Sequence, residues 1–174
     1  TLAHTRTIVD PRYGAKVTGK IGRTIVGVLV ADDEAAGKLD DPTAAGYGHN
    51  AHVLVARAKY DLYTESNVGI IVTDREFMDA YSRVAGADGQ LRFGRNQRLG
   101  FRAVSSAHRD SEGVERSGGM LDIGYRKEGR TFSYSVMHFE LSPNFRTDTG
   151  FVRRYDERLT GGNASYRWWP QGRI

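Results

Sequence analysis

The sequence predicts an all-β fold, an antiparallel up-and-down meander of about ten strands. Three observations lead to this prediction. Apolar and polar residues alternate with a period of two along most of the chain, short connections alternate with longer ones, and the composition is rich in glycine and aromatic residues. The chain has 21 Gly, 9 Tyr and 7 Phe but only 4 Pro, which is typical of many strands joined by turns.

Alternation is clearest in the second half of the chain. In one segment Leu121, Ile123 and Tyr125 oppose Asp122 and Gly124. A helix cannot gather such residues on one face, whereas a strand does so at every second position. The segments of this kind are Ala87–Phe93, Gln97–His108, Gly119–Tyr125, Thr131–Val136 and Asn163–Trp168.

The first half is also strand-like but less polar. Its expected strands are Tyr13–Ile21, Thr24–Val30, Ala51–Tyr60 and Asn67–Thr73. The second and fourth of these are apolar at almost every position. Such runs also occur in soluble sheets that are covered on both faces.

The connections favour a membrane barrel over a soluble one. In an up-and-down barrel every second connection emerges at the same rim, and membrane barrels have tight turns at one rim and loops at the other. The expected strands are also close to the roughly 9–11 residues that a tilted membrane strand needs. The expected short connections are Gly22–Arg23, Tyr63–Ser66, Gly94–Asn96 and Glu128–Gly129, and the long ones are Asp32–Asn50, Glu76–Val84, Arg109–Ser117 and Ser142–Thr149. We therefore expect the meander to be part of an outer-membrane-type β-barrel.

Composition excludes several other classes. The absence of cysteine excludes disulfides and cysteine-ligated zinc. No apolar run approaches the length of about 20 residues that a membrane helix needs. The net charge is +4, but the arginines are spread along the chain, so we expect no nucleic-acid partner. Residues 1–174 are expected to form a single β-barrel domain, a fragment truncated at both ends, because the chain starts at Thr1 without a signal peptide.

Several stretches resemble a known bacterial family. These are GAKVTGKIGRTIVGVLVA (14–31), ESNVGIIVTDRE (65–76), RVAGADGQLRF (83–93) and SPNFRTDTGFVRR (142–154). Together they resemble the domain of unknown function 5916 family, and Gly150–Arg154 is the most specific piece. The resemblance implies a β-barrel domain in the outer membrane, C-terminal to a carbohydrate-binding family 9-like module that this chain lacks. Proteins with this domain often carry a hydrolase label, which no residue here supports.

The sequence contains no motif for catalysis or for metal binding. Neither Gly-x-Ser-x-Gly nor His-Glu-x-x-His occurs, so we assign no catalytic residue, no metal and no cofactor. His49 and His52 could share a metal with loop carboxylates, but two exposed histidines are expected. The acidic residues of the longest loop could bind calcium, but a solvated loop is expected; they are Asp32, Asp33, Glu34, Asp40 and Asp41.

The polar faces of the strands form the best candidate site. The residues expected to face the barrel lumen are Asp88, Gln90, Arg92, Arg98, Arg102, Asp122, Arg126 and Arg167. Rings of Arg and Asp can select solutes, although mutual pairing would merely satisfy the interior. The residues expected at the membrane interface are the aromatics Tyr60, Tyr63, Phe93, Tyr125, Tyr134, Trp168 and Trp169, with Tyr155 a further candidate.

From these observations we expect a segment of a bacterial outer-membrane barrel, with membrane lipid as its partner. It would anchor or accompany a carbohydrate-binding module, through which glycans would be bound, and solute passage is a further expectation. Two alternatives remain open. One is a soluble carbohydrate-binding β-domain, and the other is the barrel part of a glycan-active hydrolase whose active site is largely outside this chain.

Overall fold

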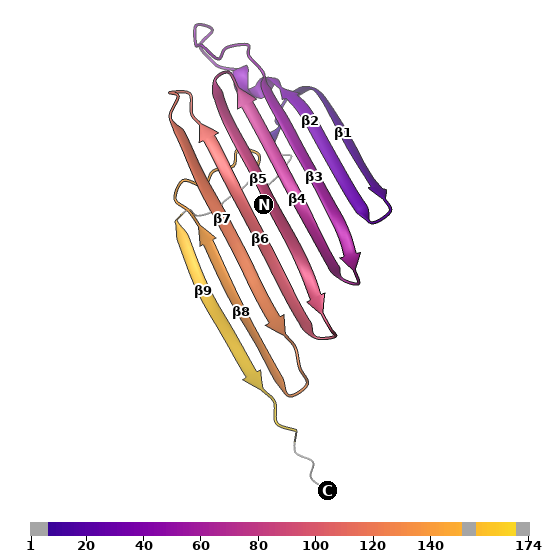
Figure 1. Cartoon of the computed structure of the whole chain (residues 1–174). Coiled ribbons are helices and arrows are strands. Elements are labelled where there is room, and N and C mark those ends of the chain that lie inside the picture. The colour runs from indigo at the N-terminus through magenta and orange to yellow at the C-terminus, as the bar shows by residue number, and fades with distance from the viewer. Residues whose placement is uncertain (1–6, 151–155, 170–174) are drawn as a thin grey trace.

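A single antiparallel sheet contains nearly all the regular structure of the protein. The computed structural model describes residues 7–150 and 156–169. Its strands are β1 (Pro11–Ile21), β2 (Thr24–Asp33), β3 (Ala51–Tyr63), β4 (Ser66–Phe77), β5 (Ala80–Phe93), β6 (Gln97–Arg109), β7 (Glu115–Lys127), β8 (Phe132–Leu141) and β9 (Glu157–Tyr166), with a short 3-10 helix, η2 (Glu34–Gly37). Figure 1 shows the strands side by side in chain order.

The all-β, up-and-down prediction is confirmed. Each of the nine segments expected from the sequence corresponds to one strand, although Thr131 precedes β8 and Arg167 and Trp168 follow β9, and every neighbouring pair is antiparallel. The strands have 10–14 residues, which is long compared with the 5–6 that are commonest in globular proteins. The described residues form nine strands rather than about ten, and within them β1 and β9 each have one neighbour. The sheet is therefore open, and closure into a barrel is not seen.

The connections differ in length at the two ends of the sheet. Residues 22–23, 64–65, 94–96 and 128–131 make the tight connections at one end, which we call the turn end. Residues 34–50, 78–79, 110–114 and 142–156 connect strands at the other, the loop end (Figure 1). The expected loop over Glu76–Val84 was wrong. Its residues belong to β4 and β5, which are joined by Met78 and Asp79 alone, with Met78 at a φ of +55°.

The wrongly assigned loop is a charged strand end. Arg83 forms ion pairs with Asp74, at 3.4 Å, and with Glu76 of the neighbouring strand. Because these side chains pair across the strands, the charge that suggested a loop is compatible with a regular ladder.

The small buried core lies on one face only. Residues 142–150, which we call the strap, leave β8 and cross the sheet at the loop end. Phe145 of the strap is 1% exposed and packs with Val84, Val104 and Leu141. The nearest approach is at Gly118, where any Cβ atom would overlap the backbone of Phe145. Glycine at this position therefore lets the strap lie directly on β7.

Candidate functional site

Strand register sorts the side chains into two faces. Asp88, Arg102 and Asp122 lie opposite one another in β5, β6 and β7 and so point to the same side. We call this side the polar face and the other the apolar face. The polar face holds seven of the eight residues expected to face a lumen; these are Asp88, Gln90, Arg92, Arg98, Arg102, Asp122 and Arg126. Arg167 follows β9, where its N–H donates to the Thr131 carbonyl at 2.7 Å.

An ion pair crosses the middle of the polar face. The Arg57 guanidinium donates to both carboxylate oxygens of Asp88, at 2.9 and 2.7 Å. Arg57 was not among the expected site residues, although its place in the alternation of β3 could have identified it. The pair spans β4 at Gly69, where a Cβ would lie 3.0 Å from the Asp88 carboxylate and 3.1 Å from the Arg57 guanidinium.

A second cluster joins the polar face to the turn end. Glu65, in the β3–β4 turn, pairs with Arg92 and, at 2.9 Å, with Arg98. The Gln90 amide donates to the Glu65 carbonyl at 3.3 Å. Three of the expected residues thus meet at Glu65, two at its carboxylate and one at its backbone carbonyl.

Between these clusters the polar face is hollowed. Arg102 and Asp122 are cross-strand partners, yet no ion pair joins them in the described part of the chain. Next to them Gly100 and Gly124 face each other, and no atom outside its immediate neighbours lies within 4 Å of a Cβ built at Gly100. These residues line a depression of about 510 Å³ with charged groups of both signs. Such a surface can hydrogen-bond polar solutes, but it presents no arranged nucleophile or acid–base pair.

The strap covers the polar face toward the loop end. Its backbone N–H groups at Arg146 and Asp148 donate to the hydroxyls of Ser106 and Ser82, at 3.2 and 3.1 Å. The Thr149 hydroxyl donates to Thr73 at 2.9 Å. Thr73, Ser82 and Ser106 lie on the polar face of three successive strands. A row of small hydroxyl residues of this kind in the sequence indicates that a polar segment packs against that face.

The opposite face is apolar and uncovered. In β4, Ile70 and Val72 point to this face and are 58% and 43% exposed. Ile71 and Thr73, which alternate with them along the strand, point to the polar face and are 7% and 1% exposed. Among the described residues no strand or helix packs on this face, since element contacts join neighbouring strands and η2 only. The exposed aliphatic residues of this face lie in β1–β4 and in β7 and β8; they are Val17, Val28, Val30, Leu54, Ile70, Val72, Leu121, Ile123 and Val136.

Aromatic residues lie on the apolar face toward the turn end. The rings of Tyr125 and Tyr134 pack at a tilt of 39° with centroids 5.8 Å apart, and the Phe132 ring lies 5.6 Å from that of Tyr134. Tyr60 and Phe93 lie on the same face near the ends of β3 and β5 and are 44% and 41% exposed.

The remaining expected aromatics lie at or beyond strand ends. Tyr63 ends β3 and is exposed. Trp168 and Trp169 follow β9, and the Trp169 indole N–H donates to the Arg130 carbonyl at 3.1 Å. Tyr155 lies outside the described residues.

The histidines and the acidic loop form no metal centre. Within residues 7–150 and 156–169, no three His, Asp or Glu side chains are arranged to hold a metal ion. His52 is exposed and lies 3.3 Å from Asp32. The expectation of a solvated acidic loop was wrong for Asp32 and Asp33, which end β2 and are 3% and 1% exposed. The Asp33 carboxylate accepts backbone N–H bonds from Val9, Asp10 and Ala35 and so fixes the segment before β1.

Comparison with known proteins gives no family assignment. No family model, no curated protein and no solved structure matches the chain. None of the described residues belongs to a helix long and apolar enough to cross a membrane.

Proposed function

We propose that the sheet is part of the wall of a β-barrel in a bacterial outer membrane. The apolar face contacts lipid acyl chains, and the polar face lines the interior. The observation that carries the proposal is the set of exposed aliphatic side chains that β1–β4, β7 and β8 place on the apolar face. Exposed apolar surface of this extent is rare on soluble monomers and is what a lipid-facing barrel wall requires.

Charge and aromatic residues support the same orientation. On the apolar face the ion pairs lie toward the loop end, such as Arg109 with Glu115 and Arg158 with Glu140. The paired rings of Tyr125 and Tyr134 lie toward the turn end. An aliphatic belt bounded by charge on one side and by aromatic rings on the other has the layering of a membrane-spanning surface.

The proposal requires partners for the two edges of the sheet. In lipid an unpaired strand edge leaves backbone N–H and C=O groups without hydrogen bonds, and each such group costs roughly several kcal/mol. A sheet in a membrane must therefore close on itself. We infer that further strands, from a longer polypeptide or from other copies of this chain, pair with β1 and β9.

The barrel is proposed to anchor a carbohydrate-binding module, as the family resemblance implies. Passage of small solutes is a secondary proposal, supported by the depression beside Arg102 and Asp122. The strap lies over the same face and would narrow such a path. A soluble carbohydrate-binding domain would need another layer over the apolar face.

Vesicle flotation tests the proposal. The chain is refolded with phosphatidylethanolamine–phosphatidylglycerol vesicles and centrifuged through a sucrose gradient. We expect it to float with the lipid, to resist alkaline carbonate, and to migrate differently on a denaturing gel before and after boiling. A chain that stays monodisperse in detergent-free buffer and does not float would refute a membrane role.

A further inference from the structure

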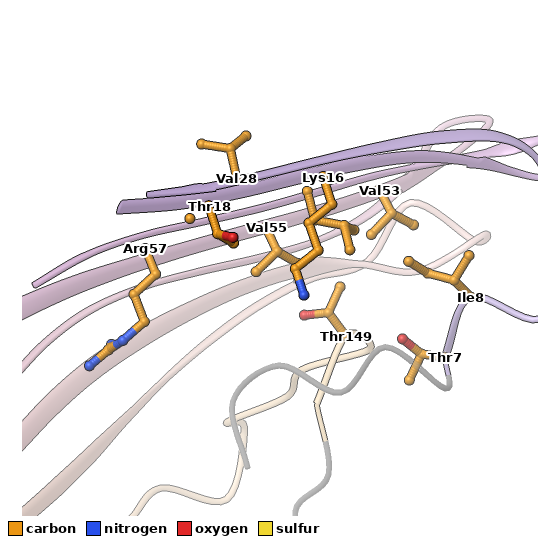
Figure 2. A pocket seen from close by; sticks show the side chains of 11 residues that line it. Thr7, Ile8, Lys16, Thr18, Val28, Val53, Val55, Arg57 and Thr149 are labelled. Carbon is orange, nitrogen blue, oxygen red and sulfur yellow. The ribbon is translucent and has the colours of Figure 1, made fainter. Parts of the chain in front are cut away.

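A small apolar cavity lies on the polar face, beside the first three strands. Its volume is about 180 Å³, and its floor is formed by Leu29, Val53 and Val55. Ile8, from the segment before β1, and Thr149 of the strap close it from the side away from the sheet, as Figure 2 shows. It is thus a space between the sheet and two segments that cross it.

The cavity arises where β2 departs from the alternation of apolar and polar residues. The run Thr24–Val30 is apolar at almost every position, so β2 carries aliphatic side chains on the polar face as well as on the apolar one. Leu29 points to the cavity side, whereas Val28 points away from it in Figure 2. Gly27 leaves room, because the nearest atom to a Cβ there is the Thr18 methyl at 3.6 Å. A barrel wall alone does not require this second apolar surface.

One uncompensated cation lines the cavity. The Lys16 side chain reaches past Val55 toward Thr149 (Figure 2). No carboxylate in the described part of the chain pairs with its ammonium group. The other cation at the cavity, Arg57, is neutralised by Asp88 at 2.7 Å. The cavity therefore combines an aliphatic interior with a single available positive charge.

We propose that this cavity binds a small amphiphile, with its aliphatic chain against Leu29, Val53 and Val55 and an anionic head against Lys16. The floor offers apolar surface that an aliphatic chain can bury favourably, and a volume of about 180 Å³ leaves room for a medium-length acyl chain. An ammonium group favours a carboxylate over a neutral or cationic head, because the hydrogen bond is charge-assisted. This inference goes beyond the proposed function and does not depend on the outer face contacting lipid.

Photolabelling of the whole chain tests the proposal. The probe is octanoate with a diazirine near its methyl end, and labelled residues are mapped by mass spectrometry. We expect saturable labelling at Leu29, Val53 and Val55. Their neighbours Val30 and Leu54 point to the apolar face and do not line the cavity, so they report non-specific lipid-like labelling in the same peptides. Labelling that is confined to Val30 and Leu54, or that does not saturate, would overturn the proposal.

Matched variants test the two halves of the site. Gly27→Leu fills the cavity and should lower labelling at Leu29 at least about tenfold, the loss expected when burial of a few methylenes is blocked. Gly19→Leu adds the same bulk on the apolar face, where a Cβ has nothing within 4 Å, and should change nothing. Equal losses in both variants would contradict the assignment.

Lysine variants and competitors of different charge test whether the bound head group is anionic. Lys16→Met should weaken competition by unlabelled octanoate about tenfold and leave competition by octanol unchanged. Lys20→Met removes a lysine that pairs with Asp61, at 3.1 Å, on the same face and should have no effect. If octyltrimethylammonium competes as well as octanoate in the native chain, the anionic head is disproved.

Discussion

The guanidinium of Arg57 in β3 bonds to the carboxylate of Asp88 in β5 across the whole width of β4. The two side chains meet over Gly69, whose missing Cβ leaves the space that the pair occupies. This crossed pair fixes three neighbouring strands and neutralises two charges at the centre of the polar face.

Gly69→Ala should weaken this pair. A methyl group there would lie 3.0 Å from the Asp88 carboxylate, so the ion pair must shift. We expect a loss of about 1–2 kcal/mol in the free energy of unfolding, measured by urea denaturation in lipid vesicles. Gly100→Ala is the control, because it adds the same methyl to open space on the same face and should be neutral or slightly stabilising. Equal effects would show that Gly69 has no special role.

Gly118→Val should lift the strap from the sheet. Any side chain at Gly118 overlaps the backbone of Phe145. We expect faster tryptic cleavage after Arg146, whose N–H is held by Ser106 in the native chain.

The neighbouring residue provides the control for this substitution. Gly119 points to the other face, where a Cβ meets only the Val104 carbonyl oxygen, at 3.8 Å. Gly119→Val should therefore leave the cleavage rate unchanged. A strap cut at the native rate in the Gly118→Val variant would contradict its position on β7.

Phe145→Ala should destabilise the protein by about 3–5 kcal/mol, the usual cost of removing a buried aromatic ring. Phe145 is 1% exposed and belongs to the buried apolar cluster beneath the strap. Phe132→Ala, at a ring that is 46% exposed, should cost much less. Urea denaturation of both variants measures the difference, and a Phe145→Ala effect no larger than that of Phe132→Ala would argue against the core described above.

Asp110, in the β6–β7 loop, should titrate below its usual pKa of 3.8. The cause is first the hydrogen bond from the Val114 N–H at 2.9 Å, and then those from the Glu112 N–H and from Arg116. Because the folded pKa is depressed, its contribution to stability is present above the unfolded pKa and is lost as pH falls through the folded one.

A carboxyl-carbon NMR titration measures this pKa directly. The Asp110→Asn variant should lose the corresponding pH dependence of amide exchange at Val114. An Asp110 carboxyl that titrates at or above 3.8 would contradict the hydrogen bonding of this loop.

The two faces of the sheet were predictable because alternation is a local property. Asp88, Arg102 and Asp122 could be placed together without knowing the register, since each strand shows which side chains share its polar side. The loop expected around Arg83 was wrong for a related reason. A cluster of charges indicates solvent, and one strand's sequence does not reveal that its charges pair with the next strand.

The strap could not have been found in this way. Phe145 lies among Pro, Asn, Arg and Thr, a composition typical of an exposed loop, and its burial depends on contacts with Val84 and Val104 that are distant in sequence. The Arg57–Asp88 pair depends likewise on the glycine of an intervening strand. Alternation could have placed Arg57 and the hydroxyls of Thr73, Ser82 and Ser106 on the polar face, but the partners of these residues follow from the tertiary arrangement.

Site-specific labelling along β7 tests the membrane-wall proposal most directly. The chain has no cysteine, so single cysteines can be placed at Leu121, Asp122, Ile123 and Gly124 and given an environment-sensitive fluorophore. In vesicles, the account predicts quenching by doxyl-labelled lipid at 121 and 123, and not at 122 and 124. Equal quenching by aqueous iodide at all four positions, with no quenching by lipid, would contradict it.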